Sequence, residues 1–107
     1  MNNLKKYRQL IRSHLLEDVM QFWQNSDLID KVNGGYYTSV DRFGKLYNTD
    51  KSVWFQGRCL WTYSALINKY GYNPIWVENA KTGKAFLEKY CTDTDERMFF
   101  TVTKDGK

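Results

Sequence analysis

The sequence predicts a mainly α chain with three helices, a β-hairpin between the first two helices and a strand near its end. Three observations lead to this fold class. Apolar residues recur at helical spacing in three long segments. Two shorter segments combine aromatic and β-branched residues with Gly-containing turns, as strands and hairpins do. Aromatic residues make up 17% of the 107 residues, which predicts a packed core in one small domain or in a piece of a larger one.

The first predicted helix begins at Asn2 or Asn3, either of which can cap it, and ends at about Trp23 or Gln24. Its apolar positions are Leu4, Tyr7, Ile11, Leu15, Val19 and Phe22. Polar residues fill the other side, so we expect one face to cover a core and the other to meet water. His14 lies at the edge of the apolar face, where a surface role is favoured over a catalytic one.

A β-hairpin is predicted after the polar connection of residues 24–35. One strand covers Tyr36–Val40, the turn covers Asp41–Gly44, and the chain returns over Lys45–Tyr47. Two roles stay open for this hairpin. It either closes a helix end, or its Tyr side chains, Tyr36 among them, and the Gly34-Gly35 bend line the mouth of a cavity.

The second predicted helix, Asp50–Tyr70, is capped by Asp50 or Ser52 and ends before Gly71. Apolar side chains occupy nearly its whole circumference, so we expect it to be buried on most sides. One stripe of the helix also carries two cationic residues; this stripe consists of Lys51, Trp54, Arg58, Trp61 and Ala65. Two roles are open for Arg58. It either pairs with a carboxylate at a junction between elements, which is slightly favoured on the residues alone, or points into a pocket towards a polar or anionic group.

The third predicted helix has Asn73 as its cap and Pro74 in its first turn, and it ends near Cys91. A strand over Met98–Thr103 follows. The order of residue types in 99–107 repeats that of the hairpin at 36–45: two aromatics, Thr, Val, a polar turn, Gly and Lys. The repetition predicts a helix–hairpin repeat, so residues 1–107 are expected to form a single partial domain at the N-terminus of a longer protein, with the strand lacking its hairpin partner.

The charged residues indicate no nucleic-acid partner, because the 16 Lys and Arg residues are scattered and no binding motif accompanies them. Cys59 and Cys91 lack metal or disulfide spacing, and a single His offers no metal site. No signal peptide or membrane-spanning run is visible, so we expect a cytoplasmic protein with no membrane partner.

The chain resembles the N-acylglucosamine 2-epimerase family over nearly its whole length. The most specific block is Lys51-x-Val53-Trp54-x-Gln56-Gly57-Arg58-x-x-Trp61. Supporting segments are His14-Leu15-Leu16, Phe22-Trp23, Gly34–Thr38, Asp41–Tyr47, Phe99-Phe100-Thr101 and Asp105-Gly106. The resemblance implies the N-terminal portion of an (α/α)6 barrel, in which the second helix is an inner helix and the other two are outer helices.

The resemblance also implies a reaction. N-acetylglucosamine and N-acetylmannosamine interconvert when a base removes the C2 proton of the open-chain sugar and an acid returns one to the other face. Arg58 would be the catalytic electrostatic group, and Trp54, Lys51, Trp61 and Tyr36 would bind the sugar. Gln56 points away from the stripe and is expected to be structural.

The family's proton carriers are two His residues on later inner helices, whereas this sequence holds only His14. We therefore expect the 107 residues to be inactive alone. The resemblance implies no cofactor and no metal, a small sugar as substrate and a possible homodimer. Two alternatives stay open: an aldose–ketose isomerase or oligosaccharide 2-epimerase of the same barrel type, and a non-catalytic truncated chain or interaction module.

Overall fold

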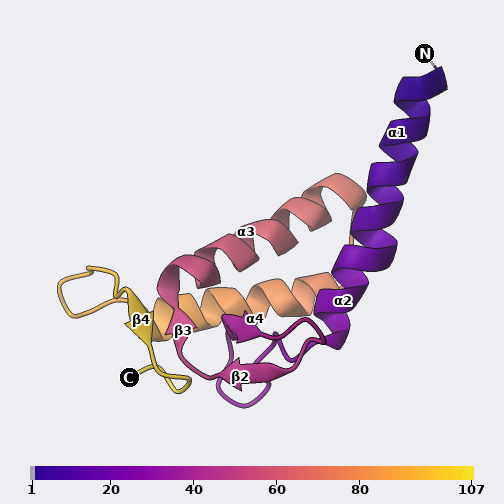
Figure 1. The fold of residues 1–107 in the computed structure, drawn as a ribbon. Coiled ribbons are helices and arrows are strands. Elements are labelled where there is room, and N and C mark those ends of the chain that lie inside the picture. The colour runs from indigo at the N-terminus through magenta and orange to yellow at the C-terminus, as the bar shows by residue number, and fades with distance from the viewer. Residues whose placement is uncertain (1) are drawn as a thin grey trace.

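A computed structural model describes residues 2–107 and is mainly helical (Figure 1). The first helical segment consists of α1 (Asn2–Ser13), the π-helical η1 (His14–Val19) and α2 (Met20–Asn25). Its end agrees with the predicted one to within two residues. The wider turn of η1 was not expected, because a one-sided apolar pattern does not distinguish an α-helix with a short π segment from a regular one.

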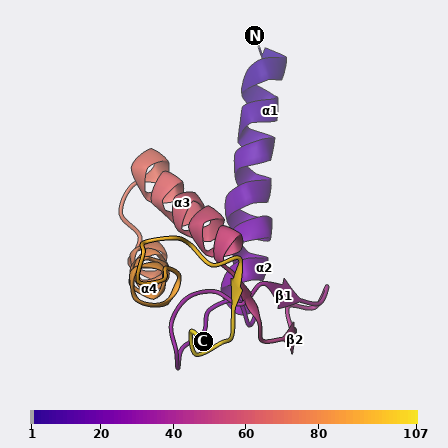
Figure 2. The same cartoon turned by 90° about the vertical axis from the view of Figure 1, so that its left-hand side faces the viewer.

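The first part of this helical rod stands away from the rest of the molecule (Figures 1 and 2). The side chains of Leu4, Tyr7 and Ile11 are exposed there, whereas Met20 is buried and Trp23 packs against the core. In the second half of the rod, Leu15 of the predicted apolar face packs against the core, but Val19 is 45% exposed and the buried Met20 was not on that face. The prediction that the apolar face covers a core is therefore correct only in part for the second half and wrong for the first half within residues 2–107.

The predicted hairpin is present as β1 (Ser39–Val40) and β2 (Leu46–Asn48), which pair antiparallel with a bulge between Ser39 and Val40. The approach to it passes under the helices at Gly35, which has a φ of +76°. A Cβ atom there would meet the Phe86 ring at 2.7 Å and Gln56 Oε1 at 2.8 Å, so only glycine fits without displacement of its neighbours.

Two long helices form the body of the molecule: α3 (Val53–Tyr70) and α4 (Pro74–Tyr90) lie side by side (Figures 1 and 2). The Ser52 hydroxyl caps α3 by accepting a hydrogen bond from the Phe55 N–H, and the Asn73 side chain caps α4. The main core lies between these helices and the end of the rod, and consists of Met20, Leu28, Tyr36, Tyr63, Leu66 and Trp76.

The outer side of α3 is exposed, which corrects the prediction that this helix is buried on most sides. In residues 2–107, 67% of the Trp54 surface and 71% of the Trp61 surface is accessible to solvent, and Arg58 between them is exposed as well.

None of the helices in the described part of the chain combines the length and the apolar character needed to cross a membrane.

The last strand is not left unpaired, which corrects a second prediction. β4 (Thr101–Val102) pairs antiparallel with β3 (Lys51–Ser52), the two residues directly before α3. A second core cluster, made of Val53, Phe86, Cys91 and Val102, lies beneath this pair. The strand pair therefore joins the end of the chain to the beginning of α3.

The same five-residue turn occurs three times, over residues 41–45, 93–97 and 103–107. In each copy the first N–H donates to the fifth carbonyl, the fourth N–H donates to the first carbonyl, and the first side chain accepts from the fifth N–H. The predicted similarity between the hairpin and the end of the chain thus corresponds to one turn geometry, and the third copy, at 93–97, was not predicted.

Candidate functional site

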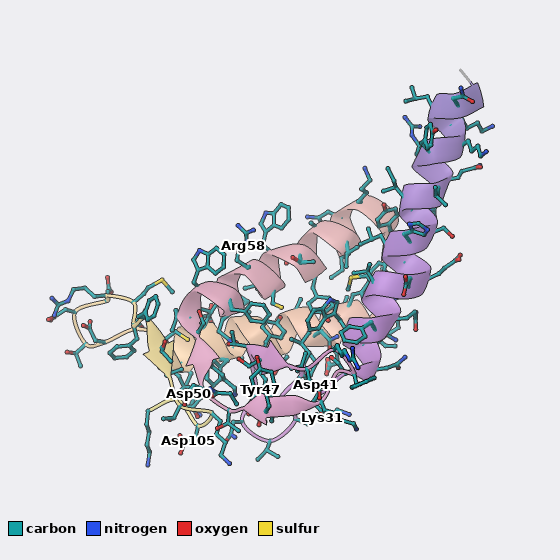
Figure 3. All side chains as sticks on the ribbon, in the orientation of Figure 1. Lys31, Asp41, Tyr47, Asp50, Arg58 and Asp105 are labelled. Carbon is teal, nitrogen blue, oxygen red and sulfur yellow. The ribbon has the colours of Figure 1, made fainter. Side chains whose placement is uncertain are left out.

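The exposed face of α3 carries a cation stacked on an aromatic ring. The Cζ atom of Arg58 lies 4.8 Å from the centre of the Trp54 ring, one helical turn away. Figure 3 shows Arg58 on the side of α3 that is turned away from α4. No ion pair in residues 2–107 involves Arg58; the pairs present join Lys51–Asp30, Lys84–Glu88, Arg97–Asp93 and Arg97–Asp95. The junction role considered for Arg58 therefore finds no carboxylate partner in the described residues.

A groove of about 420 Å³ lies beside this cation. One wall is the first turn and a half of α3, and the other is the segment before β4. We call it the Arg58 groove; its lining residues are Val53, Trp54, Gly57, Arg58, Met98, Phe99 and Phe100. The two walls are tied together because the Val53 N–H donates a 3.0 Å hydrogen bond to the Phe100 carbonyl.

The second wall was missed as a site feature by sequence reasoning, which treated Met98–Thr103 only as a strand. The signal that could have indicated it is the Phe99–Phe100 pair, since one of two consecutive aromatic side chains in a strand must leave the core. Phe100 is 86% exposed. Aromatic surfaces with one well-placed polar group are typical of sites that bind small molecules.

A second, smaller hollow of about 210 Å³ lies on the other side of Arg58, between α2 and α3. Its lining is mostly apolar and consists of Met20, Trp23, Leu28, Phe55, Arg58, Cys59, Thr62 and Tyr63. Burial raises the pKa of the Cys59 thiol to about 12, which favours the protonated thiol at neutral pH.

Trp61 lies on the same exposed face as Trp54 and Arg58, but it does not line the Arg58 groove. It borders a shallow surface hollow with Ser64, Ala65, Asn68 and Lys69 further along α3. The structure thus places Trp54 and Arg58 together and puts Trp61 one turn beyond them.

Tyr36 is fully buried below α3 and α4. Its hydroxyl donates to the Asn79 carbonyl, and its backbone N–H and carbonyl both bond the side chain of Gln56. Burial, with Cys59 and Tyr63 nearby, raises the pKa of the Tyr36 hydroxyl. The hairpin that follows lies across the molecule from Arg58, as the labelled Asp41 and Tyr47 in Figure 3 show. This arrangement agrees better with a hairpin that closes helix ends than with one that lines the Arg58 groove.

Lys51 is also fully buried, because it lies in β3 before the Ser52 cap and not on the helical stripe. Its ammonium group donates to Asp30 Oδ2 at 2.7 Å and to the carbonyls of Gly34 and Lys104, each at 2.8 Å. Burial alone would raise the pKa of Asp30, but hydrogen bonds from the Asn33 N–H and from Lys51 outweigh it and lower this pKa to about 2.

His14 is exposed on η1 and does not line the Arg58 groove. Within residues 2–107, no three His, Cys, Asp or Glu side chains lie close enough together to hold a metal ion. The groove therefore presents one guanidinium group among aromatic rings. Such an arrangement can stabilise a developing oxyanion while the rings exclude water.

Comparison with known proteins identifies the family of this chain. Residues 35–107 match the sequence profile of the family described as N-acylglucosamine 2-epimerase (GlcNAc 2-epimerase). The N-acylglucosamine 2-epimerase of Bos taurus is 32% identical over 96 residues, which cover 86% of this chain and 22% of that protein. The cellobiose 2-epimerase of Eubacterium cellulosolvens is 29% identical over 101 residues, which cover 92% of this chain and 24% of that protein.

A solved structure extends the similarity to three dimensions. The cellobiose 2-epimerase from Bacillus thermoamylovorans has a TM-score of 0.84 and 25% identity, over 96% of this chain and 26% of that one. The structural neighbours are α/α barrels, so the prediction of a mainly α chain that forms part of such a barrel is confirmed. The chain spans only 22% to 26% of the relatives named here. On the strength of these matches, the chain belongs to the N-acylglucosamine 2-epimerase family.

Proposed function

We propose that this chain supplies the Arg58 groove of a sugar 2-epimerase that interconverts N-acetylglucosamine and N-acetylmannosamine. The observation that carries the proposal is the exposed Arg58 stacked on Trp54 beside an aromatic groove, with no carboxylate paired to it in residues 2–107. The match to the family profile and the similarity to the bovine epimerase support the choice of reaction.

The chemistry explains why such a cation is useful. Removal of the C2 proton from the open-chain sugar places negative charge on the C1 oxygen. A fixed guanidinium beside that oxygen binds it more strongly in the transition state than in the ground state, and this difference accelerates the step. Stacking on Trp54 fixes the plane of the guanidinium before the sugar arrives.

The proposal divides the predicted site residues into two groups. Arg58 and Trp54 face the sugar, and Trp61 contacts it further along α3. Tyr36 and Lys51, whose polar atoms are engaged in the interior, support the groove from behind. Proton transfer is assigned to residues outside this sequence, because its one His, His14, is exposed on η1 away from the groove lining. Residues 1–107 alone are therefore proposed to be inactive.

A second candidate is an epimerase of β-linked disaccharides, because cellobiose 2-epimerases are among the similar proteins and structures. The deprotonation chemistry at C2 is the same, so the Arg58 groove fits both. Turnover of N-acetylmannosamine compared with cellobiose by the full-length protein separates the two candidates.

The test of the proposal replaces Arg58 by Ala in the full-length protein that carries this chain. We expect kcat/KM to fall about 100-fold or more, the usual effect of removing an oxyanion-stabilising donor. Deuterium incorporation at C2 from D2O should fall in parallel, because epimerisation and exchange both pass through the same negative charge on the C1 oxygen. Arg12→Ala is the matched control, since the Cζ atom of Arg12 also lies over an aromatic ring, 5.4 Å from the centre of Tyr70. Near-parental turnover in Arg58→Ala would exclude the role.

A further inference from the structure

A single ammonium group joins three separate segments of the chain. Lys51 Nζ donates one hydrogen bond to the Asp30 carboxylate, one to the Gly34 carbonyl and one to the Lys104 carbonyl. These acceptors come from the connection before the hairpin and from the last turn of the chain. All three donor hydrogens of the lysine are therefore used. The side chain of Lys51 is 0% exposed and that of Asp30 is 2% exposed.

The environment of this ion pair holds it in one geometry. The ammonium lies 4.3 Å from the centre of the Phe86 ring and 5.0 Å from that of Tyr37. Asp30 Oδ1 accepts hydrogen bonds from the backbone N–H groups of Val32 and Asn33, each at 3.0 Å. No buried side-chain polar atom in residues 2–107 lacks a hydrogen-bond partner. A charge pair satisfied on every side is rigid, because any movement would leave a buried charge unpaired.

The same residue is connected to both walls of the Arg58 groove. Lys51 precedes the Ser52 cap of α3, and its backbone pairs with Val102 in β4. Its side chain holds the Lys104 carbonyl two residues further on. The groove walls begin immediately beyond this junction, at Val53 on one side and Phe100 on the other, where the two residues share a hydrogen bond.

We propose that Asp30 and Lys51 are a positioning pair that fixes the spacing between the two walls of the Arg58 groove, and hence the place of Trp54 and Arg58 relative to Phe99 and Phe100. The assignment of a catalytic purpose to this spacing rests on the proposed function. The spacing itself is a property of the chain and can be tested without any sugar. Sequence reasoning placed Lys51 on the sugar-binding stripe; here it acts through the groove walls.

The test is amide hydrogen exchange, measured by NMR on the full-length protein that carries this chain. The reporter is the Val53 N–H, since it bonds the Phe100 carbonyl across the groove junction, and the reference is the N–H of Leu66 in α3, whose side chain lies in the main core and not in the cluster beside the ion pair. Lys51→Met removes the ammonium but leaves a buried carboxylate, which can unfold the chain. The double variant Asp30→Asn with Lys51→Met removes both charges and replaces each side chain by one of similar volume, so no buried charge is left unpaired.

In the double variant we expect exchange at Val53 to accelerate at least tenfold while exchange at Leu66 stays within twofold of the parent. Lys84→Met is the matched control, because it removes the exposed ion pair to Glu88 and should change neither amide. Unchanged protection of Val53 would overturn the proposal, and so would an equal loss of protection at Val53 and Leu66, which would indicate general destabilisation.

Activity of the full-length protein forms the second part of the test. If the parent epimerises and Arg58→Ala does not, the double variant should lose kcat at least tenfold with a smaller change in KM, since misplacement affects the transition state more than binding. Unchanged kcat would overturn the positioning role while leaving the proposed function intact. If the parent does not epimerise, the proposed function fails, and the exchange result alone decides whether the pair sets the spacing.

Discussion

The guanidinium carbon of Arg58 lies 4.8 Å from the centre of the Trp54 ring, and both side chains are exposed on the same face of α3. An exposed cation normally moves freely in water, but stacking on an indole restricts it to one plane. The groove wall formed by Phe99 and Phe100 faces this pair. The spacing of the two residues, one helical turn, is what the Trp54-x-x-x-Arg58 pattern encodes.

Replacement of Trp54 by Leu should weaken catalysis without unfolding the chain. The ring is 67% exposed, so little buried surface is lost, but the guanidinium loses its aromatic support. A cation–π contact contributes about 0.5–2 kcal/mol, so we expect kcat/KM of the full-length protein to fall by roughly 2-fold to 30-fold. The kcat/KM of Trp54→Phe, which keeps a ring, should lie between that of Trp54→Leu and that of the parent. Equal kinetics of Trp54→Leu and the parent would contradict the stacking role.

Gln56 is predicted to be a major source of stability although its side chain is polar. It is fully buried, accepts a 2.8 Å hydrogen bond from the Tyr36 N–H and donates a 2.6 Å bond to the Tyr36 carbonyl. Gln56→Leu leaves both backbone groups buried without partners, which should lower the free energy of unfolding by about 2–4 kcal/mol. Urea unfolding followed by circular dichroism measures this change. Gln21→Leu, at an exposed position of α2, should shift it by less than about 0.5 kcal/mol.

The helices and their caps could be predicted from the sequence because their signals are local. Ser52, Asn73 and Gly71 mark the ends of α3 and the start of α4 in both the pattern and the structure. The structural role expected for Gln56, from its position opposite the stripe, also agrees with its burial. The helix ends are determined by residues within one or two turns, whereas the burial of Gln56 also depends on its hydrogen bonds to Tyr36.

The features that sequence reasoning missed depend on contacts between distant segments. The partner of Thr101–Val102 is Lys51–Ser52, about 50 residues earlier, and no local pattern specifies that pairing. The same contact draws Lys51 out of the helix, so a helical wheel that starts at Asp50 assigns it to the wrong face. The second wall of the groove was missed for the same reason, because Phe99 and Phe100 reach α3 only through this strand pair.

Acid should destabilise the chain through Asp30. Its pKa is lowered from 3.8 to about 2 in the folded chain, so the folded state holds the ionised form more strongly than the unfolded state does. The resulting stabilisation is present above pH 4 and is lost as the pH falls through 4 towards 2, and it amounts to about 2 kcal/mol. Urea unfolding at pH 6, 4 and 2.5 measures it. In the double variant Asp30→Asn with Lys51→Met, which lacks both charges of the pair, the loss between pH 6 and 2.5 should be smaller by most of this amount; an identical loss in both proteins would contradict the assignment.

Replacement of Glu96 by Gly should stabilise the chain, because Glu96 occupies the position that glycine holds in the other two copies of the five-residue turn. Its φ is +64°, compared with +82° at Gly44 and +87° at Gly106. A left-handed conformation costs a non-glycine residue roughly 1–2 kcal/mol, and the added freedom of glycine in the unfolded chain offsets about 0.5–1 kcal/mol of that gain.

We therefore expect Glu96→Gly to raise the free energy of unfolding by about 0.5–1 kcal/mol, seen as a higher urea midpoint with an unchanged slope. Thr94→Gly is the matched control: it lies in the same exposed turn at negative φ, so it gains nothing in the folded state and should lower the midpoint. Changes of opposite sign in the urea midpoint of the two variants would establish that the turn at residues 93–97 stores backbone strain at Glu96. A lower midpoint for Glu96→Gly would instead mean that the side chain of Glu96 stabilises the turn by more than its conformation costs.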